Sequence, residues 1–175
     1  MRMVLLAMVL PLLIPASVPA FGQDASPLAS ALRSDAERYE KNLVAAAESM
    51  PPAKYGTKPT DKQMGFGELL HHIVLSNNLL CASISGQRAP QGAQVSATAS
   101  KDGLVGALKE SFGFCRTALA GLDDSRLGEE VPFFGGRTVT RAASILDLAA
   151  DWGDHYSLVA TELRLAGLLP PTAKQ

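Results

Sequence analysis

The sequence predicts an all-α protein, a four-helix bundle that runs up, down, down, up with a long crossover between its second and third helices. Four segments repeat apolar residues at helical spacing, and almost nothing alternates as a strand would. The connection between the second and third segments, at residues 87–100, is long enough to run the length of a bundle. Two parallel neighbouring helices require such a connection.

The first helix is expected over residues 26–50. Ser26 is a favourable N-cap, Pro27 suits the first turn, and Pro51 stops the helix. Its apolar side chains fall on one face, as in an amphipathic bundle helix: Leu28, Leu32, Tyr39, Leu43, Ala46 and Met50.

The second helix is expected over residues 66–84, with Gly65 and Glu68 offering a capping arrangement at its start. Asn77 lies within its apolar stripe, and a polar residue there needs a hydrogen-bond partner. The third helix is expected over residues 101–122, again with one apolar face.

The fourth helix is expected to begin near Thr138 or Thr140, after the turn FFGGR, and to end at Gly167, a residue typical of helix ends. Its inward stripe includes Trp152 and His155. We therefore expect His155 to face the core.

Residues 1–22 have the pattern of a cleaved signal peptide. Arg2 precedes an apolar run, and small residues follow for cleavage after Ala20 or Gly22. The run is short and broken by proline, so no stable membrane insertion is expected after processing. The sequence therefore predicts a periplasmic or secreted protein.

The remaining chain suits one domain over residues 24–171, with a short C-terminal tail at 172–175. Loss of Arg2 with the signal peptide reduces the 16 basic residues to 15, against 17 acidic ones. With no basic run, the sequence offers no footprint for nucleic acid. The sequence is also compatible with a homodimer formed through an apolar face.

Cys81 and Cys115 lie at similar depths in the second and third helices. In parallel neighbours these depths match, and disulfides persist in an exported protein. We expect a Cys81–Cys115 disulfide. The alternative is that both are small buried apolar residues, since cysteine is among the most buried residue types.

The histidines and one carboxylate suggest a metal site. Asp151 and His155 are four residues apart and project from one face of the fourth helix, which lets two ligands reach one ion. His72 would supply a third ligand from the antiparallel second helix. A His, Asp, His set suits Zn²⁺, Ni²⁺ or another first-row divalent ion. The alternative is an Asp–His hydrogen bond that stabilises a buried imidazole.

Three neighbouring residues have two interpretations each. Trp152 and Tyr156 are either core and rim aromatics or the walls of a substrate site. Glu68 is either a carboxylate that favours the helix start or a group that orients His72.

The segments MGFGELLHHIVLSNNLLC, FGFC and FFGGRTVTRAASILDLAADWGDHYSLVATELRLAGLLPP resemble the DinB-like proteins, in particular their exported bacterial branch. The resemblance covers residues 24–171 and implies a four-helix bundle with the long crossover. It also implies a divalent metal held by a histidine of the second helix and an HxxxH pair of the last. His72 and His155 match two of these ligands, whereas Asp151 stands where the pair has its first histidine. A carboxylate binds the same ions and adds one negative charge.

The resemblance implies thiol transfer, metal-assisted isomerisation or hydrolysis without choosing among them. Our first hypothesis is a hydrolase or transferase that uses Zn, Ni, Fe or Mn on a small molecule, with Asp151 or Glu68 as base. The second is a non-catalytic structural or metal-binding bundle with a degenerate site. An enzyme needs the site open to solvent, whereas a scaffold can close it.

Overall fold

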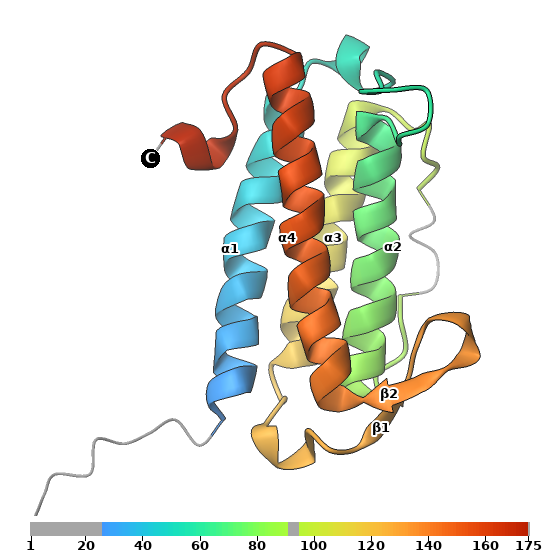
Figure 1. Cartoon of the computed structure of the whole chain (residues 1–175), viewed down its shortest axis with the longest axis vertical. Coiled ribbons are helices and arrows are strands. Elements are labelled where there is room, and N and C mark those ends of the chain that lie inside the picture. Colours follow the sequence, from blue (N-terminus) through green and yellow to red (C-terminus); the bar gives the residue numbers. More distant parts are fainter. Residues whose placement is uncertain (1–25, 91–94, 175) are drawn as a thin grey trace, which may run out of the picture.

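The computed structural model describes residues 26–90 and 95–174, so the expected signal sequence lies outside the described residues. The chain folds as an all-α four-helix bundle (Figure 1), as predicted. Its helices are α1 (Pro27–Ser49), α2 (Phe66–Ser85), α3 (Lys101–Leu119) and α4 (Arg141–Leu165). Four short 3-10 turns are η1 (Pro52–Lys54), η2 (Asp124–Arg126), η3 (Phe134–Gly136) and η4 (Pro171–Lys174).

The helices run up, down, down, up, and the crossover after α2 returns the chain to the end where α2 began (Figure 1). Helix α2 packs against α3 and α4, and α1 packs against the same two helices from the other side. Because α2 and α4 are antiparallel neighbours, the middle of one faces the middle of the other. None of the helices described here has the length and apolar content of a membrane span.

The predicted disulfide is present between α2 and α3. Cys81 and Cys115 are both fully buried, and their Cα atoms lie 5.3 Å apart, within the range of disulfide-linked pairs. The parallel arrangement of α2 and α3 brings the two cysteines to the same level, as their matched depths predicted.

Asn77 of α2 has the partners that its buried position requires. Its Oδ1 accepts a hydrogen bond of 2.7 Å from Trp152 Nε1, and its Nδ2 donates one of 3.0 Å to Ser111 Oγ. Asn77 and Trp152 are both fully buried. One amide side chain therefore links α2, α3 and α4 in the centre of the core.

A small β-hairpin precedes α4, which the sequence patterns did not predict. Strands β1 (Glu130–Pro132) and β2 (Thr138–Thr140) pair antiparallel, with Val131 opposite Val139. Residues 138–140 are β-branched, which favours this pairing over a first helical turn. Helix α4 therefore begins at Arg141, next to the later of the two expected starts, and Thr140 caps it by accepting a hydrogen bond from Ala143 N. Helix α3 also ends earlier than expected, at Leu119.

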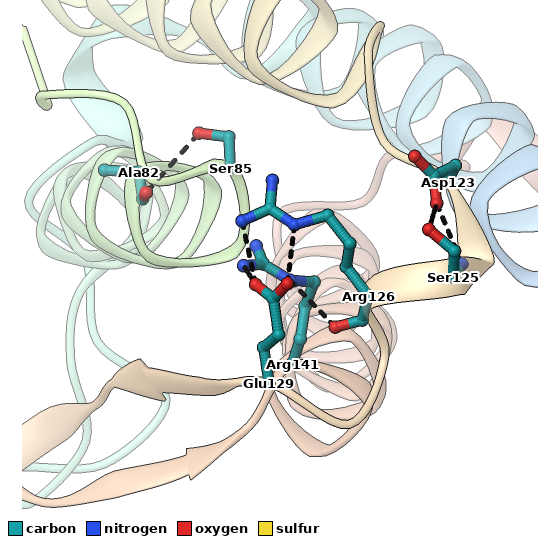
Figure 2. A network of polar contacts seen from close by, with 7 residues as sticks. All are labelled: Ala82, Ser85, Asp123, Ser125, Arg126, Glu129 and Arg141. Atoms are coloured by element: carbon teal, nitrogen blue, oxygen red, sulfur yellow. Dashed lines mark hydrogen bonds and ion pairs between the residues drawn. The ribbon is translucent and has the colours of Figure 1, made fainter.

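The base of the hairpin is fastened to the start of α4 by charged groups. Figure 2 shows the Glu129 carboxylate between the guanidinium groups of Arg126 and Arg141, at 2.8 and 2.9 Å. Hydrogen bonds from both arginines lower the pKa of Glu129 to about 2. Arg141 is buried and also donates to the Arg126 carbonyl, so its charge is compensated.

The amino end of α1 is capped from a distant part of the chain. The backbone amides of Leu28 and Ala29 each donate a 2.9 Å hydrogen bond to the carboxylate of Asp124. Asp124 lies in η2, after α3. A carboxylate at a helix N-terminus satisfies free amides and complements the helix dipole.

Candidate metal centre

His72 of α2 and the pair Asp151 and His155 of α4 converge at the interface of the two helices. One ligand atom from each residue lies within 4.8 Å of the other two. Asp151 and His155 are one helical turn apart, and the antiparallel α2 places His72 opposite them. The three candidate ligands predicted from the sequence therefore lie close together in the structure. His71, the residue before His72 in α2, is not part of this group.

The ring of His155 is held in one orientation by its own helix. Its Nδ1 donates a 2.7 Å hydrogen bond to the backbone carbonyl of Asp151, which can only accept. In the neutral ring, the lone pair is therefore on Nε2. A hydrogen bond that fixes one nitrogen of a histidine and leaves the other free is the usual arrangement at metal sites.

The carboxylate of Asp151 has an oxygen with no hydrogen bond. Its Oδ2 is buried and lies 3.2 Å from His155 Nδ1, whose N–H is directed to the backbone carbonyl instead. The side chains of Asp151 and His155 are 19% and 12% exposed. A buried carboxylate oxygen without a donor is costly unless a cation or a donor approaches it.

His72 forms the outer side of the group. Its ring centroid lies 4.8 Å from that of His155, at an interplanar angle of 51°, and the residue is partly exposed to solvent. Loss of solvation, with the nearby His155, lowers the pKa of His72. The polar contact with the Asp151 side chain raises the pKa of His155 against the opposing effect of burial. The pKa values of the two rings are thus shifted in opposite directions.

This donor set fits a first-row divalent ion. Two imidazoles and one carboxylate are ligands that such ions accept, and the unpartnered Asp151 oxygen is an acceptor that an ion would satisfy. The partly exposed His72 leaves the outer side of the group reachable from solvent.

The neighbouring aromatic residues are structural. Trp152 is fully buried, and its ring packs 6.0 Å from Tyr39 and 5.9 Å from Phe112. Tyr156 lies at the rim, where its hydroxyl donates a hydrogen bond to Thr172 Oγ1. The core-and-rim interpretation of Trp152 and Tyr156 is the one that agrees with the structure.

Glu68 stabilises the start of α2 and does not orient His72. Its carboxylate accepts a 2.9 Å hydrogen bond from Gly65 N and forms a 2.8 Å ion pair with Lys58. These contacts lower the pKa of Glu68. Of its two interpretations, the helix-start carboxylate agrees with these contacts.

Sequence reasoning missed a second acidic residue near the site. Glu162 is only 5% exposed and lines a pocket between α2 and α4. A signal was available, because Glu162 is seven residues after His155 and therefore on the same face of α4. The pattern was missed because a glutamate near a helix end is normally solvent-exposed.

The fold and the site define an all-helical bundle with a His, Asp, His group on its second and fourth helices. A profile of the DinB superfamily matches residues 36–159, which is more than half of the chain. The protein belongs to the DinB superfamily, as the resemblance of its motifs implied. The comparison with curated proteins returns no match.

Solved structures share the fold at low sequence identity. A DinB-like protein from Bacillus cereus superposes with a TM-score of 0.67 at 16% identity, covering 81% of this chain and 95% of that one. A DinB-like protein from Bacillus subtilis gives a TM-score of 0.63 at 22% identity, covering 78% and 92%. A mycothiol-dependent maleylpyruvate isomerase gives 0.56 at 16% identity, covering 74% of this chain and 59% of the isomerase.

Proposed function

We propose that this protein is an exported metalloenzyme of the DinB superfamily, in which His72, Asp151 and His155 hold a first-row divalent ion. Zn, Ni, Fe and Mn all suit this donor set. The reaction would be a hydrolysis or group transfer on a small molecule. Export is supported by the expected signal sequence and by the Cys81–Cys115 disulfide, since disulfides persist outside the cytoplasm.

The observation that carries this proposal is the buried Asp151 Oδ2 without a hydrogen bond. In a purely structural Asp–His pair, the carboxylate would accept a hydrogen bond from the imidazole N–H. Here that N–H bonds to the Asp151 carbonyl at 2.7 Å, the Oδ2 atom lies farther away at 3.2 Å from Nδ1, and one carboxylate oxygen is within 4.8 Å of a ligand atom of His72 and of His155. An acceptor in that position is suited to a cation.

Each residue would have a distinct role. His155 presents Nε2 with its ring already oriented, which lowers the entropy cost of binding an ion. Asp151 contributes the negative charge, and His72 closes the group from α2 while its exposed side admits a substrate. When bound, the ion would supply Lewis-acid chemistry to a substrate oxygen. Asp151 is also the candidate general base nearest to the site, where it would accept a proton from the substrate or from water.

Similarity to a thiol-dependent isomerase supports an enzyme but does not select the reaction. A non-catalytic bundle is the second candidate. It is favoured by the His155–Asp151 carbonyl hydrogen bond, which holds the ring without any ion. The two candidates differ in whether the three residues take up metal in solution.

Elemental analysis of protein purified without chelator or affinity metal tests the proposal. We expect about one equivalent of a first-row metal in the wild type, lost in His72→Ala and His155→Ala. His71→Ala is the matched control, because it removes an adjacent histidine outside the group. A substrate screen follows if metal is found. A metal-free wild type that also fails to take up added Zn²⁺ or Ni²⁺ would overturn the metal site.

A further inference from the structure

A pocket of about 280 Å³ lies one helical turn from the His, Asp, His group, toward the end of the bundle where α2 begins. Leu69 and Leu158 line it, and they are three residues from His72 and His155 respectively. The rest of its wall includes Lys62, Met64, Thr161 and Glu162. The pocket thus has an apolar body with a carboxyl group in its wall.

The side chain of Glu162 forms no hydrogen bond or ion pair within the described parts of the chain, although the residue is only 5% exposed. Buried carboxyl groups are normally paired, because an isolated one loses its solvation without compensation. Burial, with the added repulsion of Glu68, raises the pKa of Glu162 to about 7. Burial therefore favours the neutral carboxyl group unless a positive group approaches it.

The charges around Glu162 indicate what it can bind. Glu68 on α2 is the one charged group that shifts the pKa of Glu162, and it raises this pKa because it is a second negative charge. Lys58, on the preceding loop, is paired with Glu68 at 2.8 Å, while Lys62 lines the pocket without lowering the pKa of Glu162. A positive hydrogen-bond donor in the pocket would complement this carboxylate.

We propose that this pocket binds a small amphipathic amine, whose ammonium group pairs with Glu162 and whose apolar chain lies against Met64, Leu69 and Leu158. This binding goes beyond the proposed metal chemistry and does not require an ion. Glu162 and His155 lie on one face of α4, about 10 Å apart along the helix axis. An amine of that length would extend from Glu162 to the metal ligands, which would make the pocket a substrate subsite.

Calorimetric titration of the purified protein at pH 8 tests this assignment. The probes are n-hexylamine, 1-hexanol and hexanoate, which share a chain and differ in the charge of the head group. We expect hexylamine to bind at least tenfold more tightly than hexanol, and hexanoate more weakly still. Glu162→Gln should remove the preference for the amine, whereas Asp147→Asn, at an exposed acidic position of α4, should keep it.

Leu158→Trp provides a second variant that leaves Glu162 in place. Leu158 is 41% exposed, so a larger side chain can be accommodated while it fills the pocket. We expect this variant to weaken hexylamine and hexanol alike. Equal binding of the three probes, no binding of hexylamine to the wild type, or an unchanged preference in Glu162→Gln would overturn the proposal. Because no metal is added, these outcomes are independent of whether the metal centre exists.

Discussion

Trp152 Nε1 donates a 2.7 Å hydrogen bond to Asn77 Oδ1 across the interface of α4 and α2. Trp152 directly follows Asp151 in the chain, and Asn77 is five residues after His72. This bond therefore fixes the register of the two helices next to the candidate ligands. Any sliding of α4 along α2 would break it and separate His72 from His155.

Replacement of Asn77 by alanine should destabilise the protein by about 2–3 kcal/mol, because it leaves the buried Trp152 N–H without an acceptor and Ser111 without a donor. Asn78→Ala is the matched control, since the neighbouring Asn78 Oδ1 has no hydrogen bond to lose. Urea denaturation measures both. Equal losses of unfolding free energy in the two variants would show that the hydrogen bonds of Asn77 do not contribute measurably to stability.

Loss of the disulfide should cost about 3–4 kcal/mol, because the link closes a loop with a sequence separation of 34 residues and restricts the unfolded chain. We expect Cys81→Ser/Cys115→Ser to lower the denaturation midpoint relative to the oxidised wild type. Reduced wild type serves as the control and should behave like the double variant. Two free thiols in the denatured, unreduced wild type would contradict the disulfide itself.

Glu162 should make stability depend on pH. Its pKa is about 7 in the folded state against an ordinary value of 4.5, so the folded state binds the proton more tightly. This contribution is fully present below about pH 4.5 and is lost as the pH rises through about 7. Glu162→Gln should therefore gain on the order of 2 kcal/mol over the wild type at pH 8 and almost nothing at pH 4.

Thermal denaturation between pH 4 and 8 would follow this difference, with Asp147→Asn as the control at an exposed position of the same helix. If the stability difference between Glu162→Gln and the wild type does not change with pH across this range, the carboxyl group is solvated in the folded state.

Substitutions at Asp151 should separate its charge from its ability to bind an ion. Asp151→Asn removes the charge while keeping the shape, and we expect it to weaken Zn²⁺ or Ni²⁺ binding at least tenfold. Asp151→His restores an HxxxH pair and should keep the binding. Competition titration with a chromogenic chelator measures both. Binding by Asp151→His but not by the wild type would show that the site has been disarmed in this protein.

The fold was predictable because its signals are local. Apolar periodicity, proline and glycine stops, and the length of the connection at residues 87–100 are written in contiguous segments. The candidate site was predictable for the same reason, since Asp151 and His155 are one turn apart on a single helix. His72 needed only the relative direction of two helices.

The remaining features depend on contacts between distant residues. Each strand of the hairpin has three residues, too few for an alternating pattern, and Val131 is fixed opposite Val139 by chain reversal. Asn77 was recognised as needing a partner, but Trp152 is 75 residues away. Glu162 is buried because two helices and the preceding loop meet over it, which no single segment encodes.

The cap that Asp124 provides to Leu28 and Ala29 has a consequence for the order in which the chain closes. A polypeptide that emerges amino end first exposes the start of α1 long before residue 124 has appeared. During that interval, the first helix has neither its distant carboxylate nor the α3 surface on which it packs. The bundle can therefore close only after most of the chain has been synthesised, so the amino end of α1 must wait unpaired for a partner almost a hundred residues away.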